Sequence, residues 1–120
     1  MFLRFTVSDL NEGAGHPLGI FHAVRYLRDD GHLTVEQEDL ANTVFDWLYD
    51  HLDAPGEQVL EANPEAVSWF RASATDHIAN AERLIPILED HGYSVVKSRL
   101  LNPGTIVYAD SVQVLALPIP

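Results

Sequence analysis

The chain has 120 residues, no cysteine and a formal net charge of −11, and 47% of its residues are hydrophobic. These values are typical of one folded domain over residues 1–120, and the missing cysteines exclude disulfides and thiolate metal sites. The acidity argues against direct nucleic-acid binding, and the lack of a signal peptide or a bilayer-long apolar run of ~20 residues predicts a cytoplasmic protein without membrane contacts.

Hydrophobic periodicity divides the chain into strands and helices. Apolar residues that alternate with polar ones predict strands, and apolar residues that recur every three to four positions predict helices. A capping-box pattern at Thr34 and Gln37 starts one helix, and Gly31 and Gly92 end two others. In chain order we expect a strand over 1–7, helices over 18–30 and 34–52, a connection over 53–66, a strand over 67–70, a helix over 74–91, and strands over 93–101, 105–109 and 112–119.

The helix over 74–91 organises the predicted fold, because it lies between two strands. One of its faces is apolar at helical spacing, through Ala74, Ile78, Ala81, Ile85 and Leu88. Pro86 lacks a backbone donor and should bend the helix or leave the carbonyl of Glu82 free. The arrangement predicts a βαβ unit in which this helix is the crossover.

The last three strands are predicted to lie side by side, joined by turns at Pro103-Gly104 and Asp110-Ser111. This pairing would place Val96, Val107 and Val114 under the helices and leave the opposite face open. The fold class that follows is α/β (α+β). It has two layers, with a mixed, mostly antiparallel sheet covered by helices on one face, in the order β–α–α–β–α–β–β–β.

Acidic residues are concentrated in one segment: 11 of them, and no Lys or Arg, lie between Arg28 and Arg71. Some of them form a stripe on the helix over 34–52, at Glu36, Asp39, Asp46 and Asp50. This stripe could bind a basic protein, such as a nucleic-acid-binding protein whose substrate it imitates. It could equally be a solvated surface or an adaptation to high salt. Two carboxylates one turn apart make a poor cation cage, so we expect no metal site.

Two histidines and a tryptophan are the candidates for a pocket. His22 and His77 lie on helices that could face each other near Trp69, as an acid–base pair or a ligand-binding set. Each histidine could equally be a core-edge residue with a satisfied hydrogen bond. No nucleophile motif and no paired metal-binding histidines occur, and the glycines at 13 and 15 form only a weak phosphate-loop pattern.

The open sheet face is predicted to carry a second candidate site. Lys97 and Arg99 would lie there, with Tyr108 across the hairpin and Arg4 on the first strand. Apolar neighbours make this face too hydrophobic to remain exposed, which favours a homodimer. A small anionic ligand is the alternative occupant.

Several segments resemble a small family of bacterial hypothetical proteins. They are Gly19-Ile20-Phe21-His22-Ala23, Ser68-Trp69-Phe70, His77-Ile78, Ile106-Val107-Tyr108-Ala109-Asp110 and Gln113-Val114. The resemblance implies a stand-alone bacterial protein. It carries over no activity and no catalytic residue.

The function that the sequence favours is a non-enzymatic interaction or regulatory module. It would be a homodimer through the sheet face, and its acidic helix would bind a basic partner. The alternative is a small enzyme or ligand-binding domain with a pocket formed by His22, His77 and Trp69. We expect no cofactor, and the sequence leaves open whether the protein is an enzyme.

Overall fold

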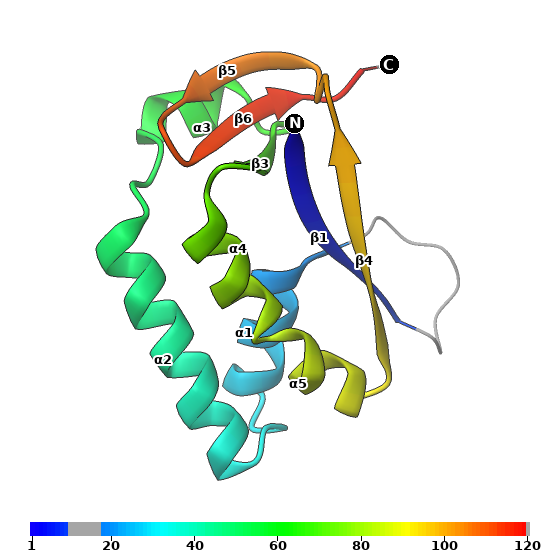
Figure 1. Cartoon of the computed structure of the whole chain (residues 1–120). Helices are drawn as coiled ribbons and strands as arrows, with labels where there is room; N and C mark the ends of the chain where they lie inside the picture. The colour runs from blue at the N-terminus through cyan, green and yellow to red at the C-terminus, as the bar shows by residue number, and fades with distance from the viewer. Residues whose placement is uncertain (10–17, 120) are drawn as a thin grey trace.

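The computed structural model of the chain describes residues 1–9 and 18–119 (Figure 1). Antiparallel strands and a group of helices make up an α+β fold, and the expected class and order of the main elements are confirmed. The strands are β1 (Phe2–Asp9), β2 (Leu18–Gly19), β3 (Val67–Arg71), β4 (Tyr93–Leu100), β5 (Thr105–Ala109) and β6 (Gln113–Leu117). The helices are α1 (Ile20–Asp29), α2 (Val35–His51), α3 (Glu57–Ala62), α4 (Thr75–Glu82) and α5 (Ile85–Asp90). Within these residues no helix has both the length and the hydropathy to cross a membrane.

Local signals fix the helix boundaries. The backbone amide of Gln37 donates to the Thr34 hydroxyl, and the Thr34 amide donates to the Gln37 side chain, both at 3.1 Å, so the predicted capping box starts α2. The helix expected over 74–91 is two helices. Pro86 has no amide to donate to the carbonyl of Glu82, and it lies instead in the first turn of α5, where that amide is not needed.

The sheet has the order β4-β1-β3-β6-β5, with β2 also paired to β1, and every pairing between described strands is antiparallel. Both β3 and β4 run antiparallel to β1 and are therefore parallel to each other. The predicted βαβ unit is present as β3–α4–α5–β4, with β1 inserted between its two strands.

The expected pairing of β4 with β5 is wrong. All eight residues of β4 pair with β1, and β5 pairs with β6, so residues 101–104 connect opposite edges of the sheet. Opposed residues in an antiparallel pair point to the same face. Lys97 and Arg99 therefore lie on the helix-covered face with Phe5 and Leu3, whereas Val96 is 49% exposed.

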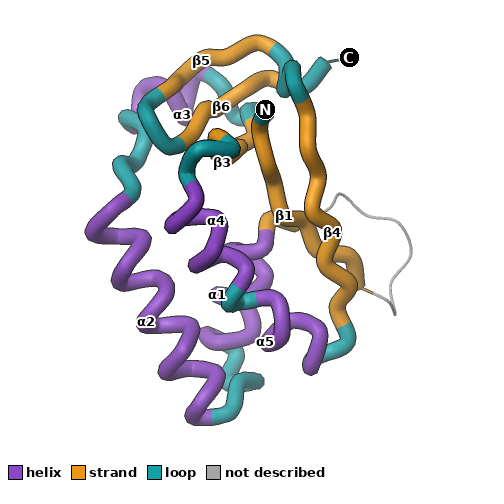
Figure 2. The backbone as a smooth tube through the Cα atoms, in the orientation of Figure 1, coloured by secondary structure: helices purple, strands orange, loops and turns teal. Residues whose placement is uncertain are grey.

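The main core lies between β1 and the helices. Leu3, Phe5 and Val7 on β1 are buried against residues from α1, α2, α4 and α5. Figure 2 shows these helices gathered on one side of β1 and β4, with the β5–β6 hairpin crossing the end of the sheet. The prediction that Val114 lies under the helices is wrong, since it opposes Trp69 in a second cluster, while Phe70 on the other face joins the main core.

The connection at 101–104 yields a stability prediction. Gly104 has φ +118°, and an added Cβ would collide with the carbonyl oxygen of Leu117. Gly104→Ala should therefore lower the free energy of unfolding by about 3 kcal/mol, because it combines a disfavoured backbone conformation with a steric clash. Urea denaturation measures the change.

Gly56→Ala is the matched control, since Gly56 has φ −61° and no atom within 4 Å of an added Cβ. It should change the free energy of unfolding by no more than ~0.5 kcal/mol. Equal effects of the two substitutions would contradict the described path of residues 101–104.

Candidate functional site

The two predicted histidines do not form one site. His77 donates its Nε2–H to the carbonyl oxygen of His51 at 2.8 Å, and its ring packs edge-on against Trp47 at 4.8 Å between centroids. This contact fastens α4 to the end of α2, where the carbonyls lack helical partners. His22, in contrast, is exposed at the start of α1 and lines a cavity together with Trp69. The expected grouping of His22, His77 and Trp69 is therefore wrong for His77.

The cavity arises from the way β1 is paired. One edge of β1 is paired with β4 over its whole length. The other edge pairs with β3 only at Phe2 and Leu3 and with β2 only at Thr6 and Val7. Among the described strands, Arg4 and Phe5 thus have no partner on this edge. β3 diverges from β1 at this point and leaves a gap that the first turn of α1 borders.

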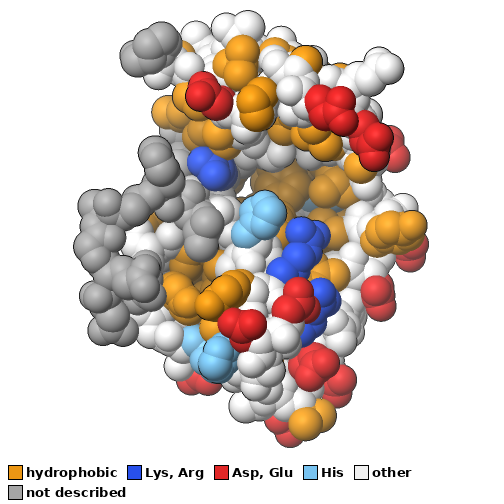
Figure 3. Space-filling view, turned by 180° about the vertical axis from the view of Figure 1, so that it is seen from behind, with side chains coloured by type: hydrophobic (Ala, Val, Ile, Leu, Met, Phe, Trp, Pro, Cys, Tyr) orange, Lys and Arg blue, Asp and Glu red, His pale blue; other side chains and the backbone are white. Residues whose placement is uncertain are grey.

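The gap is a cavity of about 330 Å³ that opens to the surface. Figure 3 views the molecule from behind relative to Figure 1. It shows a hollow near the middle, with hydrophobic side chains at the bottom and histidine and Lys or Arg side chains beside it. Its aromatic lining residues are Phe5, Phe21, Trp69 and Phe70. The polar or charged side chains that line it are Arg4, His22, Arg25, Ser68 and Gln113, and none of the described lining residues is acidic.

Arg4 is the half-buried charge of this cavity. Within the described residues its guanidinium has no hydrogen-bond acceptor and no carboxylate partner, and burial lowers the pKa of Arg4. It lies on the face opposite Lys97 and Arg99, and Tyr108 is on β5, at the far edge of the sheet. The predicted cluster of Arg4, Lys97, Arg99 and Tyr108 on an open sheet face is therefore not formed.

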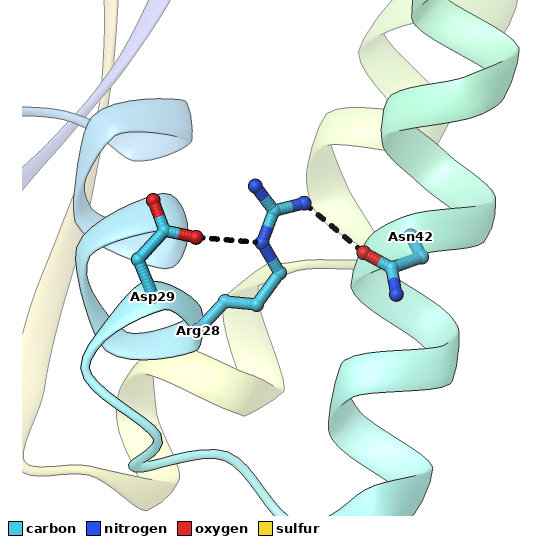
Figure 4. A network of polar contacts seen from close by, with 3 residues as sticks. All are labelled: Arg28, Asp29 and Asn42. Atoms are coloured by element: carbon cyan, nitrogen blue, oxygen red, sulfur yellow. Dashed lines mark hydrogen bonds and ion pairs between the residues drawn. The ribbon is translucent and has the colours of Figure 1, made fainter.

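Most other basic side chains have polar partners. Arg28 contacts Asp29 at 3.1 Å and Asn42 at 3.0 Å, which joins α1 to α2 (Figure 4). Arg71 donates to the carbonyl oxygen of Asp110, and Lys97 lies 3.9 Å from Glu82. Arg25, at the cavity, is held over the Phe45 ring, with 5.1 Å between its Cζ and the ring centroid.

One wall of the cavity depends on the turn between β5 and β6. Gln113 is buried and donates to the carbonyl oxygen of Asp53 at 2.6 Å. The Asp110 carboxylate accepts hydrogen bonds from the amides of Val112 and Gln113 and from the Tyr108 hydroxyl, each at 2.8 Å. Burial works to raise the pKa of Asp110, but these bonds outweigh burial and hold that pKa below its usual value.

The predicted acidic stripe is present on α2 and faces solvent. Glu36, Asp39, Asp46 and Asp50 are all exposed. No group of three or more His, Cys, Asp or Glu side chains in the described part of the chain is arranged to hold a metal. Binding of a basic partner by this stripe stays a prediction.

Sequence reasoning missed several lining residues. Arg25 follows His22 by one helical turn, so the spacing of these two side chains was a usable signal. Gly19 directly precedes α1 with φ −65° and ψ 149°, and its lack of a side chain leaves the cavity open beside His22. Nothing local predicts Ser68 or Gln113, because the pairing of β3 with distant strands puts them there.

Comparisons with known proteins do not identify a relative: no family model, curated protein or solved structure matches the chain. The function must therefore be inferred from the geometry of the cavity.

The Asp110 turn gives a pH-dependent prediction. Because the pKa of Asp110 is depressed in the folded state, the stability it contributes is present above the ordinary aspartate pKa of 3.8 and is lost as the pH falls below that value. Asp110→Ala should lower the free energy of unfolding by about 2 kcal/mol at pH 7, from the lost hydrogen bonds. The difference from the wild type should shrink as the pH falls below that value.

Urea denaturation at pH 7 and pH 3 measures both effects. Asp50→Ala is the control, because Asp50 is an exposed carboxylate on α2. It should change the free energy of unfolding by no more than ~0.5 kcal/mol at pH 7. A deficit in Asp110→Ala that stays constant down to pH 3 would contradict the role given to the charged carboxylate.

Proposed function

We propose that this protein is a ligand-binding domain that takes a small organic molecule into the cavity between β1, β3 and the first turn of α1. The observation that carries the proposal is the unpaired backbone edge of β1 at Arg4 and Phe5, which borders an open cavity where a neighbouring strand would otherwise lie. Its volume of about 330 Å³ lies at the lower end of the range for small-molecule sites.

The lining has the composition expected of such a site. Aromatic side chains supply large apolar contact surfaces, and a few polar groups supply orientation. The proposal is for binding and assigns no reaction, because a catalytic base is typically held in position by a third group. Among the described residues, no hydrogen-bond partner orients the His22 ring.

Binding of a basic protein through the acidic stripe is a separate proposal with less support. Exposure makes the carboxylates accessible, but a solvated surface or a high-salt adaptation accounts for them equally well. The homodimer through the sheet face loses its original argument, because the side chains expected to form that surface lie on different faces and edges.

Gly19 provides a direct test, because its backbone angles suit any residue and its added Cβ would lie 4.0 Å from Cδ2 of His22. The probes are three naphthalene compounds that differ in charge: 2-naphthoate, 2-naphthamide and 2-(aminomethyl)naphthalene. At least one should cause saturable shifts in the ¹H–¹⁵N spectrum at Gly19, His22, Ser68 and the Trp69 indole. Gly19→Leu should weaken this binding at least about tenfold by filling the cavity mouth, since most of a small ligand's surface is buried in its site.

Gly19→Ala is the matched control and should bind the same probe within about twofold, because its single methyl group makes only an ordinary contact. The proposal is overturned if none of the three probes shifts these signals at 10 mM. It is also overturned if Gly19→Leu, with an otherwise unchanged spectrum, binds as well as Gly19→Ala.

A further inference from the structure

We infer that the ligand of this cavity is an organic carboxylate, with an aromatic or similarly flat apolar body and its carboxylate group on the guanidinium of Arg4. The inference rests on the proposed function and specifies the class of molecule that the cavity takes. Three observations carry it: the charge of the lining, the unpaired state of Arg4 and the aromatic walls.

The lining reverses the charge balance of the chain. The protein has 18 acidic residues and 7 Lys or Arg residues, yet the described lining includes two of those arginines, Arg4 and Arg25, and no carboxylate. The net charge of the molecule repels an anion at long range, but physiological salt screens that field beyond about 8 Å. The half-buried guanidinium of Arg4 therefore dominates the field inside the cavity.

Arg4 lacks the acceptors that a half-buried guanidinium normally has. Four of the seven basic residues (Arg28, Arg71, Arg83 and Lys97) have polar side-chain or backbone partners within the described chain. The other three, without such partners there, are Arg4, Arg25 and Arg99, and two of them line the cavity. Arg4 is the more buried of these two. A carboxylate would supply the two parallel acceptors that match the guanidinium fork.

The reduced pKa of Arg4 has burial as its cause. A neighbouring carboxylate would oppose that effect by favouring the charged form. The guanidinium is nevertheless charged at neutral pH. The site is therefore a desolvated cation whose counter-charge an anionic ligand would provide.

The rest of the lining fits the apolar part of the ligand. Phe21, Trp69 and Phe70 offer ring surfaces, and the strand register puts Arg4 on the same face of the sheet as Trp69. A carboxylate is favoured over a phosphate because the single half-buried guanidinium of Arg4 balances one negative charge, whereas a phosphate carries more than one. Arg25, held over Phe45, is at the exposed end and contributes less.

The test compares molecules of one shape and different charge, by NMR titration of the full chain. The wild-type protein should bind 2-naphthoate at least tenfold more tightly than the neutral 2-naphthamide, and more tightly than 2-naphthyl phosphate. Arg4→Met should reduce the affinity for 2-naphthoate at least tenfold while leaving that for 2-naphthamide within about twofold. Retained 2-naphthamide binding shows that the variant is folded and its cavity is intact.

Arg99→Met is the matched control, because it removes the same charge from an exposed residue outside the cavity. It should keep the preference for 2-naphthoate.

Equal binding of naphthoate and naphthamide by the wild type would overturn the carboxylate inference and leave the proposed function standing. Tighter binding of the naphthyl phosphate would also overturn it, and an undiminished preference in Arg4→Met would refute the role of Arg4. Failure of these probes and of 2-(aminomethyl)naphthalene to bind would overturn the proposed function itself.

Discussion

The pairing of β1 is the constraint on which the rest of the structure depends. This strand is hydrogen-bonded to β4 along one entire edge, but its other edge is shared by β3 and the two-residue β2. The two short partners do not meet, so the edge has an unpaired stretch at Arg4 and Phe5. Because backbone polar groups need partners, such a stretch inside a sheet is stable only where solvent or a ligand can reach it.

The surrounding packing keeps this gap from closing. Phe70 packs into the main core and so holds its part of β3 against β1. The preceding residue, Trp69, points to the opposite face and is buried in a second cluster with Val114. β3 therefore follows β6 away from β1. On the other side of the gap, α1 begins directly after β2, and its buried Ile20 and Val24 hold the first turn in place. Moving either border inward would expose core side chains.

The sequence predicted what local signals determine. The alternation in residues 1–7 and the Thr34–Gln37 capping box each act over a few residues, and each has its expected effect. Pro86 also acts locally, but it lies in the first turn of a separate helix instead of bending one continuous helix over 74–91. The partner of β4 was not predictable in the same way, because Val95 and Val96 make its two faces similarly apolar and the choice depends on distant β1. The cavity lining was predicted in part, because Arg4, His22 and Trp69 were already candidate site residues. The sequence had grouped Arg4 with Lys97, however, and only the non-local strand pairing puts Arg4 in the same cavity as His22.

Residue-resolved amide hydrogen exchange along β1 tests the unpaired edge most directly. Successive amides of a strand point to opposite edges, so one of the amides of Arg4 and Phe5 must face β4 and the other the gap. The account predicts that the amide facing β4 is protected like its neighbours, and that the other exchanges at least about 100-fold faster. Equal, strong protection of both amides would show that β1 is paired on both edges, and the cavity and its proposed ligand would then lose their basis.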